Sequence, residues 1–210
     1  MPTILLLSNS AAADRDLKSY IGFDWPDLRI AHIITASKGK GCDDLSYLDR
    51  TREIFRQRGA YFEDIDLSDY EEAGLELVLK RFNAVFVSGG NSFYLLKAMR
   101  ERGFAKLTPN LLAGGLIYIG VSAGAYVACP SIEMALWRHQ DKYDHCGLSD
   151  LSALGLVPFL VTVHYRQEYQ GLVREGIKRS AYPVRILTDG QAIAIRDGRE
   201  EFLGGKEIKL

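Results

Sequence analysis

Short apolar runs rich in Ile, Val and Leu alternate along the chain with amphipathic stretches. Strands of a parallel sheet are covered on both faces by helices, so they are apolar at nearly every position. The strands that we expect are residues 3–7, 29–35, 61–66, 84–88, 116–121, 159–164, 184–187, 192–196 and 201–203. The last three lie close together, which predicts antiparallel hairpin pairing in the C-terminal part. The pattern as a whole predicts an α/β fold, a doubly wound and mostly parallel sheet with helices on both faces.

Amphipathic segments between these runs predict helices at about residues 44–58, 71–82, 91–102 and 168–180. In the first segment Asp44 can cap the helix, Leu45 and Phe55 share its apolar face, and Gly59 can close it. Gly103 is a candidate stop for the third helix. We therefore expect a helix at each of these four places between the strands.

Composition limits the organisation and the class of partner. With 210 residues, 47% of them hydrophobic, and no repeat or linker, the chain is expected to form one domain over residues 1–210. The 26 Lys and Arg residues nearly balance 27 Asp and Glu residues, for a formal net charge of −1. Such a chain has no global field to hold nucleic acid or an anionic membrane. We therefore expect a small partner, with no nucleic acid and no membrane.

The cysteines and the first residues bear on the compartment. Cys42, Cys129 and Cys146 match neither the spacing of a zinc site nor a disulfide framework, which favours a reducing environment. Residues 1–8 lack the basic region and long apolar stretch of a secretory signal, and no apolar run approaches the roughly 18 residues that cross a bilayer. These features predict a cytoplasmic protein.

The first chemical motif is Gly120-Val121-Ser122-Ala123-Gly124, which directly follows the apolar run 116–119. A strand that enters Gly-x-Ser-x-Gly predicts a nucleophile elbow, in which the serine is exposed on a sharp turn between strand and helix. The helix that follows supplies free N–H groups where an oxyanion would form. Cys129, seven residues after the serine, is expected to pack in the core. The motif has only three fixed positions, so it does not decide function alone.

A serine nucleophile needs a base, and the chain has four histidines. His164 ends the apolar run 159–163, so we expect it at the carboxyl edge of a strand, where open α/β sheets place their sites. His32 lies inside an expected strand and is predicted to be a core residue. His139 and His145 lie in a polar segment that is consistent with solvent exposure. Position therefore favours His164 as the partner of Ser122.

The acidic member of a triad would fix the imidazole tautomer and stabilise the imidazolium. Asp189 follows the short run 184–187 and precedes the next apolar run. The Asp-Gly pair at this place is also a favoured hairpin turn. The spacing leaves both interpretations open.

A second glycine-rich turn, Gly89-Gly90-Asn91, connects a buried strand to a helix that Asn91 can cap. Its N–H groups could supply an oxyanion donor beside the N–H of Ala123. An ordinary strand–helix loop is the alternative, and the spacing matches neither the dinucleotide fingerprint nor the P-loop.

Together these motifs resemble the peptidase E, or aspartyl dipeptidase, family of serine peptidases, which belongs to the class I glutamine amidotransferase-like superfamily with its flavodoxin-like fold. The resemblance covers most of the chain and is carried by Val87-Ser88-Gly89-Gly90-Asn91-Ser92-Phe93, Gly120-Val121-Ser122-Ala123-Gly124-Ala125, Ala128-Cys129-Pro130 and Gly155-Leu156-Val157-Pro158-Phe159. The chain order of serine, histidine and acid also differs from the order in α/β-hydrolases.

The resemblance implies roles for individual residues. Ser122 would be the nucleophile, His164 the base, and the N–H groups of Gly90 and Ala123 the oxyanion hole, with Gly89 and Asn91 beside the substrate. The acid would be Asp189, where the type member of the family carries Glu, a side chain one methylene longer. The family needs no metal and no organic cofactor. A short peptide would be the substrate.

The segment 133–145 departs from the aspartyl dipeptidases, so the resemblance does not identify the specificity residues. An enzyme that selects an N-terminal aspartate needs a cation for the side chain and an acceptor for the free amine. Arg138, Lys142 and Arg166 are candidate cations, and Glu133 and Glu168 are candidate acceptors, although each has the alternative of an ordinary surface charge.

Three functions are compatible with these residues. The leading hypothesis is a serine exopeptidase or dipeptidase that cleaves short peptides, with Asp-X dipeptides as candidate substrates. The second is a hydrolase of β-aspartyl-linked peptides, similar to the cyanophycinases. The third is a binding protein that keeps the elbow without turnover. Monomer and homodimer are both compatible with the sequence.

Overall fold

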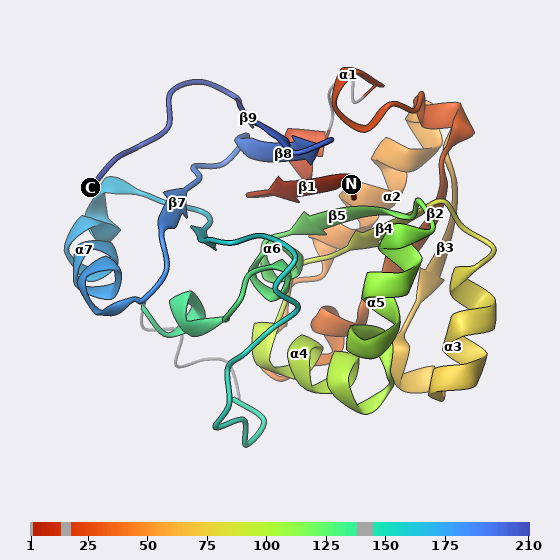
Figure 1. The fold of residues 1–210 in the computed structure, drawn as a ribbon, viewed down its shortest axis with the longest axis horizontal. Helices are drawn as coiled ribbons and strands as arrows, with labels where there is room; N and C mark the ends of the chain where they lie inside the picture. The colour runs from red at the N-terminus through yellow and green to blue at the C-terminus, as the bar shows by residue number, and fades with distance from the viewer. Residues whose placement is uncertain (1, 14–17, 138–144) are drawn as a thin grey trace.

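The computed structural model describes residues 2–13, 18–137 and 145–210, and its centre is a seven-stranded sheet (Figure 1). Its strands are β1 (Ile4–Leu7), β2 (Arg29–Ile33), β3 (Tyr61–Ile65), β4 (Ala84–Val87), β5 (Ile117–Val121), β8 (Ala192–Arg196) and β9 (Arg199–Leu203). Their order is β3-β2-β4-β5-β1-β8-β9. The first five are parallel, whereas β8 and β9 form the predicted antiparallel hairpin. The α/β prediction is therefore confirmed.

The strand register places the ends of several strands at one edge of the sheet. Leu7 at the end of β1 lies opposite Val121 at the end of β5, and opposite Ala192 at the start of antiparallel β8. Val87 at the end of β4 lies opposite Gly120. The residues that follow β1, β4 and β5, and those that precede β8, therefore meet at one edge.

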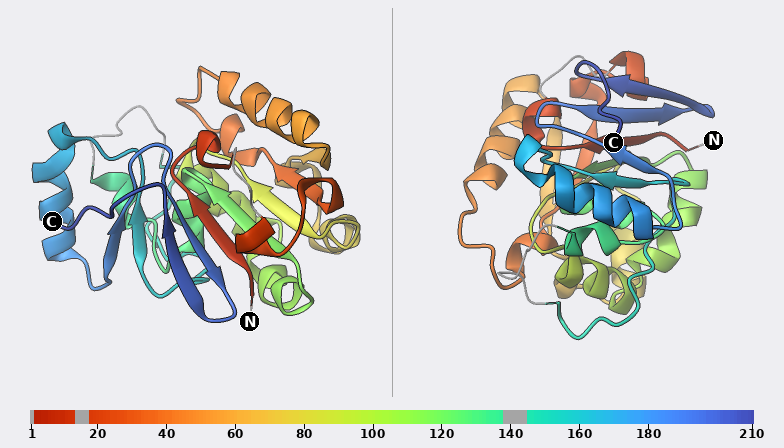
Figure 2. Two further views of the ribbon diagram at one scale, coloured as in Figure 1. Left: turned by 90° about the horizontal axis from the view of Figure 1, so that it is seen from above. Right: turned by 90° about the vertical axis from the view of Figure 1, so that its left-hand side faces the viewer.

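Helices cover both faces of this sheet, as Figure 2 shows. The helices of the described residues are α1 (Lys18–Ile21), α2 (Ser46–Arg58), α3 (Glu72–Leu79), α4 (Ser92–Glu101), α5 (Phe104–Ala113), α6 (Ala123–Ala128) and α7 (Gln170–Arg179), the last of which packs on β7 of the smaller sheet. Short 3-10 helices lie at Ser10–Ala13, Trp25–Asp27, Thr35–Lys38, Leu67–Asp69, Glu133–Leu136 and Gln167–Tyr169. Helix α2 covers one face together with α1, and α3 to α6 cover the other.

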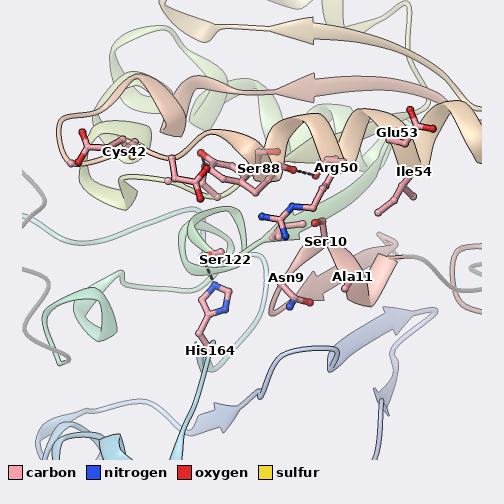
Figure 3. Close-up of a pocket in the computed structure, with 18 residues that line it drawn as sticks. Asn9, Ser10, Ala11, Cys42, Arg50, Glu53, Ile54, Ser88, Ser122 and His164 are labelled. Carbon is pink, nitrogen blue, oxygen red and sulfur yellow. Dashed lines mark hydrogen bonds between the residues drawn. The ribbon is translucent and has the colours of Figure 1, made fainter.

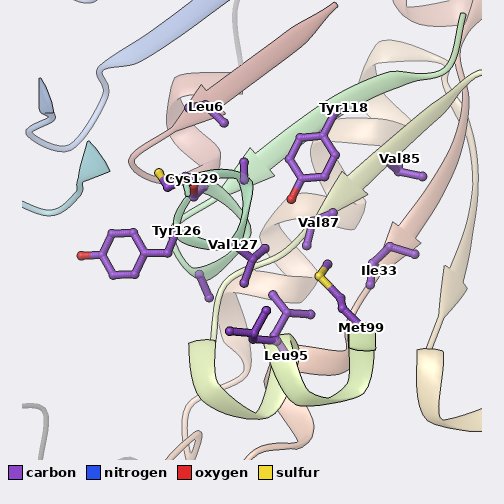
Figure 4. Close-up of a cluster of buried hydrophobic side chains, with 14 of the residues drawn as sticks. Leu6, Ile33, Val85, Val87, Leu95, Met99, Tyr118, Tyr126, Val127 and Cys129 are labelled. Atoms are coloured by element: carbon purple, nitrogen blue, oxygen red, sulfur yellow. Dashed lines mark hydrogen bonds between the residues drawn. The ribbon is translucent and has the colours of Figure 1, made fainter. Parts of the chain in front are cut away.

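The alternation of side chains along each strand divides the core into two layers. Leu6 packs in the cluster under α4 and α6, whereas its neighbours Leu5 and Leu7 pack in the cluster under α2. Figure 4 shows the first layer, where sheet side chains such as Val87 face Leu95 of α4. Because both faces are buried, both alternating sets are apolar, which explains the continuous apolar runs of the sequence.

One strand prediction was wrong in its pairing. Residues 184–187, expected to join the C-terminal hairpin, contain β7 (Val184–Ile186), which pairs in parallel with β6 (Leu160–Thr162) in a separate two-stranded sheet. Helix α7 connects these two strands, and a parallel pair needs such a crossover. Closeness in sequence therefore did not predict the strand pairing.

The helix predictions need two corrections. Helix α2 begins at Ser46 and Asp44 accepts the Ser46 N–H, but Leu45 is exposed rather than on the apolar face. Helix α5 was not predicted, and Gly103, expected to be only a stop, is the left-handed residue that also starts it. Gly59 closes α2 in the left-handed conformation, as predicted.

Two further features concern the burial of a cysteine and the length of the helices. Cys129 is buried at the end of α6, where burial raises the pKa of its thiol to about 12. Within the described ranges, no helix is both long and apolar enough to cross a membrane.

Candidate active site

Ser122 lies on the sharp turn between β5 and α6. Its backbone has φ 52° and ψ −107°, an uncommon conformation for a residue other than glycine. Its N–H donates to the Leu7 carbonyl on β1, and its carbonyl accepts from the N–H groups of Ala125 and Tyr126. These hydrogen bonds hold the strained turn on both sides.

The two glycines of the motif allow this turn to pack. A Cβ at Gly124 would lie 2.0 Å from the Val87 carbonyl oxygen, and one at Gly120 would lie 2.4 Å from the Gly124 carbonyl oxygen. Both distances are far shorter than a nonbonded contact allows, so α6 can approach β4 and β5 only with glycine at these positions.

His164 follows β6 and reaches Ser122 from a different part of the fold. Its Nε2 lies 3.0 Å from Ser122 Oγ, and its Nδ1 lies 2.6 Å from Asp189 Oδ1 (Figure 3 shows the first contact). The backbone of His164 also has a positive φ of 52°. The structure thus brings together the serine, histidine and acid that the sequence singled out.

The end of β1 holds Asp189 at this distance. Ser8 Oγ donates to Asp189 Oδ1 at 3.2 Å, and the Gly190 N–H donates to Asn9 Oδ1 at 3.2 Å. Ser8 Oγ also accepts the His164 N–H at 2.9 Å, so one buried hydroxyl connects the acid to the histidine backbone. These bonds bring the turn close enough for the shorter Asp side chain to reach the imidazole.

Sequence reasoning missed Ser8 and Asn9. A signal was present, because they are polar residues directly after a buried parallel strand. That strand is the neighbour of β5, which ends at Ser122. Strand order was the missing information, since it places the end of β1 beside the serine.

The glycine loop after β4 lies against Ser122. A Cβ at Gly89 would be 3.1 Å from Ser122 Cβ, and the Gly89 carbonyl accepts from Tyr47 Oη at 3.0 Å. Gly90 has φ 135°, and a Cβ there would lie 2.4 Å from the Ala36 carbonyl oxygen. Both glycines line the cavity over Ser122.

Asn91 is placed differently from Gly89 and Gly90. Its side-chain oxygen accepts from Phe93 N and Tyr94 N at the start of α4, and its N–H donates to the Ala36 carbonyl. Asn91 is fully buried and does not line the cavity, so we assign it to holding the loop and not to substrate contact. Ala123, also buried, is the first residue of α6.

A cavity of about 880 Å³ opens over Ser122 and His164. Its walls are the turn after β1, the loop 41–44, helix α2 and the glycine loop after β4. Arg50 is the only Lys or Arg among the described residues that line it, and Asp43, Asp44 and Glu53 also line it. Figure 3 shows the Arg50 guanidinium extending from α2 into the cavity, while His164 approaches Ser122 from the opposite side.

Of the candidate specificity residues named from the sequence, the three that the structure describes do not line this cavity. Arg166 and Glu168 are exposed and face each other at 3.7 Å, and Glu133 lies elsewhere. Arg138 and Lys142 fall outside the described residues. Arg50 was missed because a cation on an amphipathic helix is indistinguishable in sequence from a surface charge.

The other histidines are also accounted for. His32 is fully buried, as predicted, and burial lowers the pKa of its imidazole more than Asp64 raises it. His145 is exposed and packs on the Phe93 ring, with 4.3 Å between ring centroids. His139 falls outside the described residues.

Comparison with known proteins shows the family of the chain. The sequence profile of peptidase family S51 matches residues 4–203. An uncharacterized peptidase of Pasteurella multocida (strain Pm70) is 35% identical over 77% of this chain and 76% of its own length. Peptidase E of Streptomyces coelicolor is 31% identical over 99% of this chain and 86% of its own length.

Solved structures support the same fold. The crystal structure of a candidate peptidase E protein from Listeria monocytogenes EGD-e matches with a TM-score of 0.83 and 24% identity over 100% of both chains. The crystal structure of a peptidase from an acI-B1 actinobacterium matches with a TM-score of 0.67 and 16% identity. With the family profile covering nearly the whole sequence, the chain belongs to peptidase family S51, the serine peptidases of the peptidase E type.

Proposed function

We propose that this S51 peptidase cleaves its substrate through Ser122, His164 and Asp189. The observation that carries the proposal is the continuous line of Ser122 Oγ, the two ring nitrogens of His164 and Asp189 Oδ1, with contacts of 3.0 and 2.6 Å. An Asp189 carboxylate can only accept a hydrogen bond, so the proton on His164 lies on Nδ1. Nε2 is then the acceptor that faces the Ser122 hydroxyl.

The reaction proceeds by acyl transfer. Ser122 Oγ attacks the peptide carbonyl carbon while His164 Nε2 takes the hydroxyl proton. When the C–N bond breaks, His164 gives that proton to the departing amine, which leaves an ester on Ser122. Water, deprotonated by the same nitrogen, then attacks the ester and releases the acid, and Ser122 recovers its proton.

The negative charge on the carbonyl oxygen needs N–H donors. We assign this role to the N–H groups of Gly90, in the loop whose Gly89 lies against Ser122, and of Ala123 at the start of α6. The N–H of Ala123 is at the first position of its helix, so no earlier carbonyl of α6 can accept it. The Asn91 N–H is excluded as a donor because it is bonded to Ala36.

The substrates that we propose are short peptides with an N-terminal aspartate. The cavity of about 880 Å³ is within the range of small-molecule sites, roughly 300–1,000 Å³. Arg50 offers a planar guanidinium for a carboxylate, and only its hydrogen bond to Ser46 Oγ is recorded among the described residues. Asp43, Asp44 and Glu53 offer acceptors for a free ammonium group.

A dipeptide panel tests this specificity. Asp-X, Asn-X, Glu-X, Ala-X and β-aspartyl peptides are assayed with the wild type, Arg50→Ala and Arg50→Lys. We expect Arg50→Ala to lower kcat/KM for Asp-X by about 10- to 100-fold, the usual size of a charged hydrogen bond, and to leave Ala-X nearly unchanged. Arg166→Ala, which removes an exposed cation outside the cavity, is the matched control.

Two results would oppose the proposal. An equal loss for Asp-X and Ala-X in Arg50→Ala would remove Arg50 from aspartate recognition, and a preference for β-aspartyl peptides would favour the alternative hydrolase. The nucleophile is tested separately with a fluorophosphonate label. Labelling should occur on Ser122 and disappear in Ser122→Ala, which should also lack hydrolysis while remaining folded.

A further inference from the structure

A second alignment of serine, histidine and aspartate lies inside the protein, next to the cavity. His32 Nε2 is 2.7 Å from Ser88 Oγ, and His32 Nδ1 is 2.7 Å from Asp64 Oδ1. The three residues come from the neighbouring strands β2 and β3 and from the end of β4, and His32 lies directly opposite Asp64 in the strand register. The proposed mechanism does not use this alignment.

The surroundings of His32 fix the direction of each hydrogen bond. Burial would raise the pKa of Asp64, but hydrogen bonds from His32 and Arg52 outweigh it and lower the pKa to about 2. Asp64 is therefore a carboxylate that accepts the Nδ1–H of His32. Because burial keeps His32 neutral, its Nε2 carries the lone pair, and Ser88 must donate its hydroxyl hydrogen to it.

This direction excludes one role for Ser88. A hydroxyl that donates to His32 has no second hydrogen for a substrate oxyanion. Ser88 is 2% exposed, so solvent does not compete for this bond. The serine is held in one orientation by a neighbour in the core.

Asp64, at the other end of this chain of hydrogen bonds, is fixed by an arginine. Arg52 of α2 donates to Asp64 Oδ2 through Nε at 3.0 Å and Nη2 at 2.7 Å. The rings of Phe55 and Phe86 meet the His32 ring edge-on, with centroids 5.4 and 5.7 Å away. The imidazole therefore has apolar walls around it and polar partners only at its two nitrogens.

Ser88 is covalently joined to the loop that touches the reacting serine. Gly89 follows it directly and lies against Ser122, and Gly90 is the proposed oxyanion donor. On the α2 side, Tyr47 Oη donates a hydrogen bond to the Gly89 carbonyl. A displacement of Ser88 would therefore move the N–H groups of the loop relative to Ser122.

We propose that Asp64, His32 and Ser88 form a buried positioning chain that holds the loop 88–90 against Ser122 and so sets the geometry of the oxyanion site. The inference rests on the proposed function, because it assumes acyl transfer at Ser122. Ser88 and His32 act through the loop and do not contact the reacting atoms. Their loss should weaken binding of the transition state more than binding of the substrate.

The test compares kcat with KM in the full-length protein. We expect Ser88→Ala to lower kcat by about 10- to 100-fold and to change KM by less than about threefold, since loss of a whole oxyanion donor costs about 100- to 1,000-fold. His32→Phe, which keeps an aromatic ring but no nitrogen, and Asp64→Asn should change kcat in the same direction. The Ser88→Ala/His32→Phe double variant should be no slower than the worse single variant, because both remove the same chain.

A structural role alone would give a different result. Thr108→Val is the matched control, because it removes a buried hydroxyl whose hydrogen bond among the described residues stays within α5, to the Phe104 carbonyl. It should lower the melting temperature without lowering kcat. Affinity for a peptide aldehyde, whose oxygen enters the oxyanion site after addition of Ser122, should fall in parallel with kcat in Ser88→Ala.

Three outcomes would overturn the positioning chain while leaving the proposed function intact. They are a Ser88→Ala kcat within twofold of the wild type, an equal kcat loss in Thr108→Val, and fluorophosphonate labelling of Ser88 in the Ser122→Ala protein, which would make Ser88 a nucleophile. Full hydrolysis by Ser122→Ala would instead refute the proposed function itself. The two failures are therefore distinguishable.

Discussion

Replacing Asp189 with asparagine separates the charge of the acid from its geometry. Both hydrogen bonds to Asp189, from His164 Nδ1 and from Ser8 Oγ, end on the same oxygen, Oδ1. An asparagine can place its carbonyl oxygen at this position and accept both bonds. The tautomer of His164 should therefore persist in Asp189→Asn, and only the negative charge is lost.

The size of the effect follows from Coulomb's law. As His164 becomes positive in the transition state, a carboxylate about 4 Å away stabilises it by about 1 kcal/mol in water and about 4 kcal/mol near a protein surface. The side chains of His164 and Asp189 are 37% and 51% exposed, so the pair lies between these limits. We expect kcat to fall by about 5- to 1,000-fold, with KM nearly unchanged.

The assay is steady-state release of p-nitroaniline from aspartyl p-nitroanilide, corrected for active enzyme by fluorophosphonate titration. Asp197→Asn is the control, because Asp197 is an exposed acid on the β8–β9 turn. Asp189→Ala should be slower than Asp189→Asn, since it loses orientation as well as charge. If Asp189→Asn were as slow as Asp189→Ala, the argument from the shared oxygen would be refuted, and a loss below twofold would remove Asp189 from the mechanism.

Three other predictions concern packing, pH and reactivity. Gly124→Ala, whose Cβ would lie 2.0 Å from a β4 carbonyl oxygen, should cost about 3 kcal/mol or more in urea unfolding. Gly74→Ala, in open space on α3, should raise the free energy of unfolding by about 0.5–1 kcal/mol. Equal stabilities of the Gly124→Ala and Gly74→Ala proteins would contradict the close packing of Gly124 on β4. Burial lowers the pKa of His32, so the unfolded state binds its proton first as pH falls below about 6.5. The melting temperature should therefore fall more steeply from pH 7 to pH 5 in the wild type than in His32→Phe, and parallel slopes would refute this. Burial raises the pKa of Cys129 to about 12, so iodoacetamide at pH 8 should alkylate Cys42, which lines the cavity, and spare Cys129. Peptide mass spectrometry identifies the alkylated cysteines, and alkylation of Cys129 in the folded protein would contradict its burial.

The sequence predicted those candidate site residues that come directly after an expected strand. Ser122, His164 and Asp189 each follow an apolar run, and the structure brings their side chains together at one edge. This worked because buried parallel strands are recognisable by their apolar character and site residues follow their carboxyl ends. The shared edge of one sheet does not explain it, since β6 and β7, which precede His164 and Asp189, pair in the separate two-stranded sheet.

The sequence could not predict site residues whose position depends on the order of the strands or on how a helix packs beside the cavity. Arg50 lies on a helix that also carries Arg52, Arg56 and Arg58, so nothing in its spacing distinguishes it from its neighbours. Its position over Ser122 depends on how α2 packs on the sheet. The same holds for Ser8, which becomes relevant only because β1 lies between β5 and β8.

Local signals also misled two assignments. Helix α5, for which no helix was expected, contains Pro109, which lacks a backbone donor and disfavours a helix locally. Strand β7 is only a few residues before β8, but its partner is β6, on the other side of α7. In both cases long-range packing overrode the local pattern.

The position of β8 beside β1 has a consequence for synthesis of the protein. Strand β1 is made first, yet one of its edges pairs with β8, which is made after residue 191. During translation Ser122 and His164 therefore exist before Asp189, and before the strand that holds the Asp189 turn against Ser8. Under the proposed mechanism, a nascent or truncated chain would carry the proposed nucleophile and base but not the proposed acid, so full proteolytic activity would appear only when the last strands have docked.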